Sequence, residues 1–75
     1  MIAFLLVKTK SGAENAVLRK TSNLKEVLDE NILFGEWDLI LKLEIDNPES
    51  LATFVIEKIR SIKEVSLTST LIVAK

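Results

Sequence analysis

Apolar and polar positions along the chain predict four strands, of which two are the most clearly marked. From Ile2 to Val7 the side chains are nonpolar at both alternating sets of positions, which is typical of a strand covered on both sides. We therefore expect a strand from Ile2 to Thr9 in the middle of a sheet. A second strand is predicted where Leu39, Leu41, Leu43 and Ile45 alternate with Ile40, Lys42 and Glu44. This period of two is the pattern of a strand with one buried face.

The two remaining strands are less regular. The stretch from Glu26 to Phe34 is apolar at both ends, but Asp29, Glu30 and Asn31 interrupt it. Three consecutive polar side chains suit an edge strand, with or without a bulge, because they discourage pairing with other chains. A hairpin turn at Gly35, Glu36 and Trp37 joins it to the strand beginning at Leu39. Val65 to Val73 is predicted as the last strand.

Two helices are predicted from their start signals. Ser11 followed three residues later by Glu14 fits a capping box, so the first helix is expected to begin there and to end near Ser22 or Asn23. Asn47 followed by Pro48 predicts the start of the second helix, which should run to about Ser61 or Ile62. Its apolar face is formed by Leu51, Phe54, Val55, Ile59 and Ile62.

The order strand, helix, strand, strand, helix, strand predicts an α+β, ferredoxin-like βαββαβ fold. Right-handed crossovers place both helices on one face of a four-stranded antiparallel sheet in the order 4-1-3-2. The opposite face is left bare. We expect it to carry alternating residues of the first strand together with Ile40 and Ile72, an apolar patch that a second copy would cover.

Composition narrows the classes of protein. The 75 residues make one expected domain, 48% of them are hydrophobic, and there is no cysteine. A chain this short buries too little surface to be very stable alone, so we expect a homo-oligomer. The net charge of -1 argues against a phosphate-binding surface and hence against direct binding of nucleic acid. The longest apolar run, Met1 to Val7, cannot span a bilayer, and we expect a cytoplasmic protein.

The candidate binding site combines the hairpin with the last strand. Gly35, Glu36, Trp37 and Asp38 offer backbone NH groups and a carboxylate, and the last strand offers three hydroxyls, from Thr68, Ser69 and Thr70. This combination suits a small zwitterionic ligand. Catalysis is not expected, because the chain has no His, Cys or Tyr, and no metal or other cofactor is predicted.

Each of these residues also has a purely structural interpretation. Gly35 is suited to a tight turn by its conformational freedom alone, and Asp38 is suited to binding the NH groups of the turn. The hydroxyl residues are ordinary strand formers. Trp37 is as well suited to anchoring an interface between subunits as to contacting a ligand.

Three stretches resemble the effector-binding (RAM) domain of Lrp/AsnC transcription regulators: Ala3 to Lys10, Gly35 to Ile40, and Thr68 to Thr70. Because Met1 leads directly into the first strand, with no helix-turn-helix segment ahead of it, the chain is similar to stand-alone members. Trp37 departs from the family pattern, which often has Tyr or Asp there.

The resemblance implies a module that binds amino acids or related metabolites at contacts between dimers, with Gly35 to Asp38 and Thr68 to Thr70 lining the cleft. It also implies rings of dimers that modulate transcription or metabolism without binding DNA directly, and it makes full-length Lrp/AsnC-type regulators candidate partners. Two alternatives share the topology, namely an ACT-like amino-acid sensor and a small dimeric α+β barrel enzyme. An ACT-like sensor would place its ligand near Gly12, so substitutions at Gly12 and Gly35 separate the two sensors.

Overall fold

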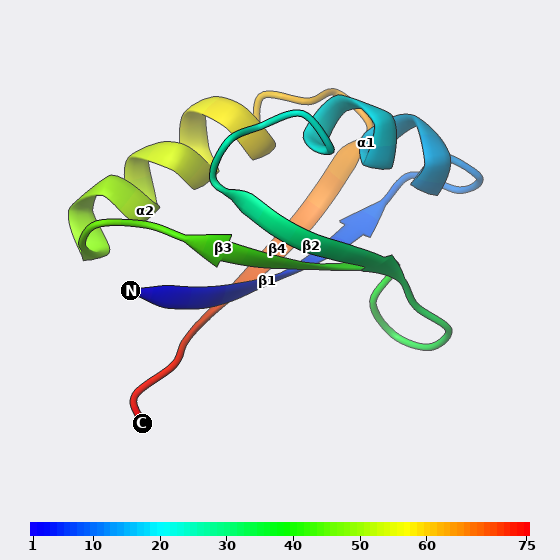
Figure 1. Cartoon of the computed structure of the whole chain (residues 1–75). Helices are drawn as coiled ribbons and strands as arrows, with labels where there is room; N and C mark the ends of the chain where they lie inside the picture. The colour runs from blue at the N-terminus through cyan, green and yellow to red at the C-terminus, as the bar shows by residue number, and fades with distance from the viewer.

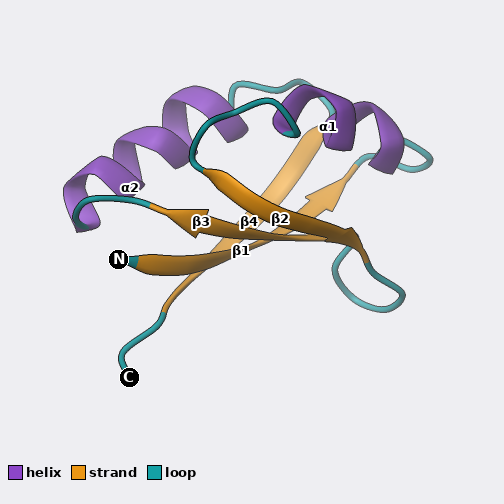
Figure 2. Ribbon diagram, in the orientation of Figure 1, coloured by secondary structure: helices purple, strands orange, loops and turns teal.

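The computed structural model describes residues 1–75 as one antiparallel sheet with both helices over the same face (Figure 1; Figure 2). Strands lie side by side in the order β2-β3-β1-β4, which is the predicted 4-1-3-2 order, and the ferredoxin-like fold is confirmed. In chain order the elements are β1 (Ile2–Thr9), α1 (Glu14–Thr21), β2 (Val27–Ile32), β3 (Leu39–Glu44), α2 (Pro48–Phe54), the π-helical continuation η1 (Val55–Ile59) and β4 (Val65–Ile72).

The central strand β1 divides its side chains between two environments. Ala3, Leu5 and Val7 are completely buried toward the helices, whereas Phe4 and Leu6 point to the bare face and are only partly buried. Antiparallel partners share a face, so the burial of β1 extends to its neighbours. The core beneath the helices consists of Ala3, Leu5, Val7, Val17, Leu39, Leu41, Leu43, Ile45, Leu51, Phe54, Val55 and Ile59.

The expected position of Ile72 on the bare face is wrong. Ile72 pairs with Ala3, which is buried under the helices, so both lie on the helix side. The register of β4 shifts between Lys8 and Thr9, and a shift of one residue moves a strand's side chains to the opposite face. Because the sequence of β4 has no clear alternation, its register could not be derived from the pattern.

The bare face is nevertheless apolar. Leu71 pairs with Phe4 and Leu67 pairs with Lys8, and these two leucines are 51% and 56% exposed. On the other side of β1, Ile40 pairs with Leu6, which places Ile40 on the same face as predicted. We call Phe4, Leu6, Ile40, Leu67 and Leu71 the open-face patch.

The predicted capping box at Ser11 and Glu14 is wrong. Helix α1 begins at Glu14 after Ala13, and no side chain caps it. The Ala13 NH instead donates to the Lys10 carbonyl at 3.0 Å, closing a turn in which Gly12 has φ +76°. This turn reverses the chain after β1 and places Ser11 too early to cap the helix. At the other end of α1, Lys20 Nζ donates to Glu64 Oε1 at 2.9 Å, and this hydrogen bond lowers the pKa of Glu64.

The start of the second helix is confirmed, but its end is not. Asn47 Oδ1 accepts a hydrogen bond from the Ser50 NH at 2.8 Å, and Pro48 is the first helical residue. The helix ends at Ile59 rather than at Ser61 or Ile62, after a π-helical turn in which the Arg60 NH donates to the Val55 carbonyl at 2.8 Å. None of the helices in the structure is long and apolar enough to cross a membrane.

Candidate functional site

The hairpin between β2 and β3 is a short, exposed loop. Its ends are joined by a hydrogen bond of 2.8 Å from the Leu33 NH to the Asp38 carbonyl, and Phe34 at its tip is fully exposed. Gly35 has φ +129°, a conformation that residues with a side chain rarely adopt. No atom lies within 4 Å of where its Cβ would stand, so within one copy the glycine is required by backbone conformation and not by space.

Asp38 ties this hairpin to the end of β1. Its Oδ2 accepts hydrogen bonds from the Thr9 NH at 2.7 Å and from Thr9 Oγ1 at 3.3 Å, while its own NH donates to the Val7 carbonyl at 3.0 Å. These contacts agree with the structural interpretation of Asp38. Its second oxygen, Oδ1, has no partner in the chain, and a carboxylate can accept about four hydrogen bonds. The residue can therefore hold the hairpin and still accept a further donor.

Trp37 and Glu36 occupy the same loop in different surroundings. Trp37 is partly buried, and Lys8 Nζ lies 6.0 Å from the centre of its ring, within the range of a cation–π contact. Lys8 follows Phe4 and Leu6 along the bare face of β1, so Trp37 stands at one end of the open-face patch. Glu36 is exposed and forms no salt bridge within the chain.

The three hydroxyl residues of β4 do not share one face. Thr68 pairs with Val7 and Thr70 with Leu5, so both lie on the helix side, whereas Ser69 pairs with Leu6 and lies on the bare side. The two threonines line a groove of about 300 Å³ between the second helix and β4. Its other walls are formed by Pro48, Leu51, Ala52, Val55, Ile56 and Arg60.

Within one copy, the hairpin and the threonines are separated by β1. Val7 pairs with Leu39 of β3 on one side and with Thr68 of β4 on the other. Two strand spacings amount to roughly 10 Å, so Asp38 and Thr68 do not meet in a single small cleft. Within one copy, therefore, a small ligand cannot contact both groups at once.

The described chain contains no group of three or more His, Cys, Asp or Glu side chains arranged to hold a metal ion. The polar groups available near the groove and the hairpin are hydroxyls, one guanidinium, the Lys8 ammonium, carboxylates and backbone NH groups. These groups bind ligands by hydrogen bonds and charge, which is the chemistry of recognition.

Comparison with known proteins decides the family. The model of the Lrp/AsnC ligand-binding domain matches residues 2–75. The chain belongs to this family. An uncharacterised HTH-type transcriptional regulator of Pyrococcus furiosus is 36% identical over 73 residues, which are 93% of this chain and 49% of the relative. The chain thus spans about half the length of the curated relatives it matches.

Solved structures agree with this assignment. FFRP-DM1 is 40% identical and has a TM-score of 0.91, with 96% of each chain covered. AsnC of E. coli is 28% identical with a TM-score of 0.94, covering 99% of this chain and 50% of that one. A transcriptional regulator of Neisseria meningitidis, solved as a complex with L-Met, shares the fold at a TM-score of 0.91 and 24% identity.

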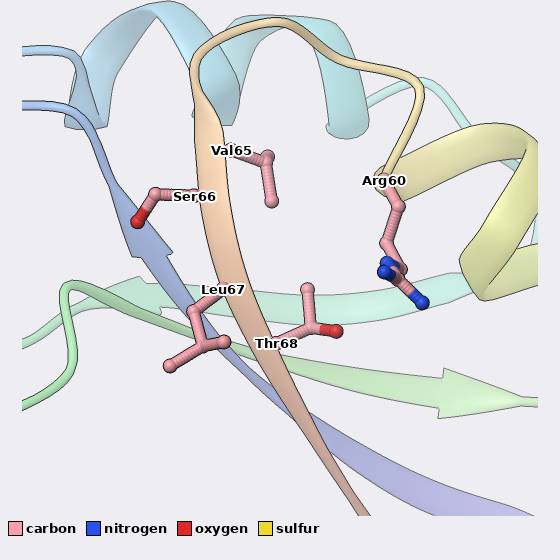
Figure 3. Close-up of a pocket in the computed structure, with 5 residues that line it drawn as sticks. All are labelled: Arg60, Val65, Ser66, Leu67 and Thr68. Carbon is pink, nitrogen blue, oxygen red and sulfur yellow. The ribbon is translucent and has the colours of Figure 1, made fainter.

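One residue of this Lrp/AsnC domain was missed by the sequence analysis. Arg60 extends from the end of the second helix toward β4, where the Thr68 hydroxyl points toward it (Figure 3). A second cavity of about 410 Å³ continues along the strand and is lined by Arg60, Val65, Ser66, Leu67 and Thr68. The sequence did hold one signal for Arg60. It lies four residues after Ile56 and eight after Ala52, a spacing that places the three residues on one side of a helix.

Proposed function

We propose that the chain senses a small molecule, an amino acid or a related metabolite, and modulates transcription through an oligomeric assembly. The observation that carries this proposal is the match of nearly the whole chain to a ligand-binding domain whose relatives are named transcriptional regulators. The same relatives, together with the lack of His, Cys and Tyr, favour a role without catalysis. In the Neisseria protein the same fold is found with an amino acid, L-Met.

The proposed ligand contacts follow from the chemistry of a zwitterion. An ammonium group needs an acceptor, which the unpartnered Oδ1 of Asp38 provides beside the backbone of Gly35 to Trp37. A carboxylate needs donors, and these are either Thr68 and Thr70 in the groove or Ser69 on the other face of the sheet. Because β1 separates these groups within one copy, the proposal places the ligand between copies, with Glu36 and Trp37 completing the wall.

A thermal-shift screen against the twenty amino acids tests the proposal. A ligand that binds only the folded state stabilises it by RT ln(1 + [L]/Kd), about 2.7 kcal/mol at a hundredfold excess over Kd. In a domain of this size the melting temperature should rise by roughly 10 °C or more at fixed protein concentration. We expect a rise for one amino acid or a few related ones. Uniform curves across all twenty at millimolar concentrations would contradict an amino-acid ligand.

We also expect that the purified chain does not bind DNA. Its net charge of -1 offers no excess of Lys and Arg to neutralise phosphates. In a gel-shift titration at moderate salt, the chain alone should leave DNA mobility unchanged. Retention seen only after mixing with a full-length Lrp/AsnC-type regulator would support modulation through mixed assembly. Sequence-dependent retention by the chain alone would disprove this part of the proposal.

A further inference from the structure

The groove between the second helix and β4 has a charged end and an apolar wall. Pro48, Ala52, Ile56 and Arg60 follow one another at intervals of four residues and form a ridge that faces β4. Thr68 and Thr70 lie across the groove from this ridge. The exposed Ile56 side chain thus lines the groove together with the two threonines, and the Thr68 hydroxyl points toward the Arg60 guanidinium (Figure 3).

The π-helical turn explains how Arg60 comes to lie on this ridge. In an α-helix, residues four apart drift around the axis by about 40° per step, because 3.6 residues complete a turn. The wider turn closed by the Arg60 NH and the Val55 carbonyl reduces this drift. Arg60 is thus kept in line with Ile56, just as Ile59 is kept in the core with Val55.

The polar groups of the groove are suited to an anion. The Arg60 guanidinium forms neither a salt bridge nor a hydrogen bond within the chain, although Glu57 lies one helical turn before it. No carboxylate side chain lines either of the two cavities that Arg60 borders. A guanidinium can only donate hydrogen bonds, in a planar fork that matches a carboxylate, and a threonine hydroxyl can add another donor.

We infer that this groove binds the carboxylate of a small molecule with an apolar tail. The Arg60 guanidinium holds the two carboxylate oxygens, Thr68 donates from the strand, and the tail lies against Ala52, Val55 and Ile56. A volume of about 300 Å³ suits a ligand of this size. The inference rests on the proposed function and deepens it, because it assigns the carboxylate end of the ligand to Arg60. A ligand that carries a carboxylate but no ammonium group should also bind in this groove.

Three matched probes separate the contributions of the two ends of such a ligand. L-leucine carries both charges, 4-methylpentanoate is the same skeleton without the ammonium, and leucinamide is the same skeleton without the carboxylate. Calorimetry on the purified protein should show binding of 4-methylpentanoate and of L-leucine. Leucinamide should bind at least tenfold more weakly than L-leucine, because it offers the guanidinium no negative charge.

Substitutions then locate the binding to the groove. Arg60→Gln should weaken 4-methylpentanoate roughly ten- to a hundredfold, since charge-assisted hydrogen bonds are lost. Arg60→Lys should recover only part of this affinity, because an ammonium lacks the planar fork. Arg19→Gln is the matched control, removing an exposed arginine from α1, and it should leave the affinity unchanged. Circular dichroism checks that all three variants fold.

The outcomes distinguish this inference from the proposed function. Binding of 4-methylpentanoate without binding of any amino acid would support the groove and contradict the amino-acid ligand. Binding of an amino acid with the same affinity in wild type, Arg60→Gln and Arg19→Gln would overturn the groove and leave the proposed function intact. The inferred groove site would also be overturned if no carboxylate bound. It would be overturned as well if Arg60→Gln changed the particle mass but not the affinity, and Arg60 would then be a contact between subunits.

Discussion

Phe4→Glu should convert the protein from an oligomer into a monomer that stays folded. Phe4 lies at the centre of the open-face patch, on the side of β1 that the helices do not cover. Neighbouring leucines that are about half exposed extend the patch across β4, so a second copy packed face to face would bury apolar surface from both sheets. In a symmetric dimer the substitution introduces two carboxylates into one interface. Each is buried without a partner, and this costs about 3 kcal/mol or more.

Light scattering at micromolar concentration measures this effect directly. Phe34→Glu is the matched control, because Phe34 is fully exposed at the hairpin tip and lies outside the patch. The control should retain dimers, and circular dichroism should show folded protein in both variants. A wild-type protein that is monomeric at these concentrations would contradict association through the open face. So would dimers that persist in Phe4→Glu.

Strand positions were predictable because burial leaves a periodic trace in the sequence. β1 is nonpolar on both faces, and the alternation in β3 marks the side of Leu39, Leu41 and Leu43 as buried. The second helix was marked at its start by Asn47 and Pro48, two residues that act locally. With these elements fixed, the handedness of crossovers left few possible topologies, so the order of the sheet followed.

Other features depend on geometry that no local pattern encodes. The face on which Ile72 lies is set by a register shift beside Lys8, and a capping motif at Ser11 was overridden by the turn at Gly12. Arg60 was missed because its four-residue spacing from Ile56 does not by itself mark a groove, and the π-helical turn that precedes it has no simple signal in the sequence. The hairpin and the Thr68 strand were grouped in sequence reasoning, but β1 separates them within one copy.

Asp38→Asn should weaken binding of the amino acid found in the thermal-shift screen by roughly ten- to a hundredfold while the fold survives. An asparagine oxygen can still accept from the Thr9 NH, as Asp38 Oδ2 does at 2.7 Å, so the hairpin stays tied to β1. The remaining amide NH₂ would then face the position that the ligand's ammonium is proposed to occupy. Two donors would meet there, and the negative charge would be gone.

Thr9→Val is the matched control for this effect. It removes the contacts of Thr9 Oγ1, at 3.3 Å to the Asp38 carboxylate and at 3.0 Å to the Lys10 carbonyl, but leaves the stronger backbone contact to Asp38 and the carboxylate itself. Valine has nearly the shape of threonine, so the variant should lose a little stability and keep its affinity for the ligand. Calorimetry measures the affinity, and thermal unfolding without ligand measures the stability. If Asp38→Asn and the double variant Thr68→Ala/Thr70→Ala both bind the amino acid as tightly as Thr9→Val, the ligand lies elsewhere and the contacts of Asp38 serve only to hold the hairpin.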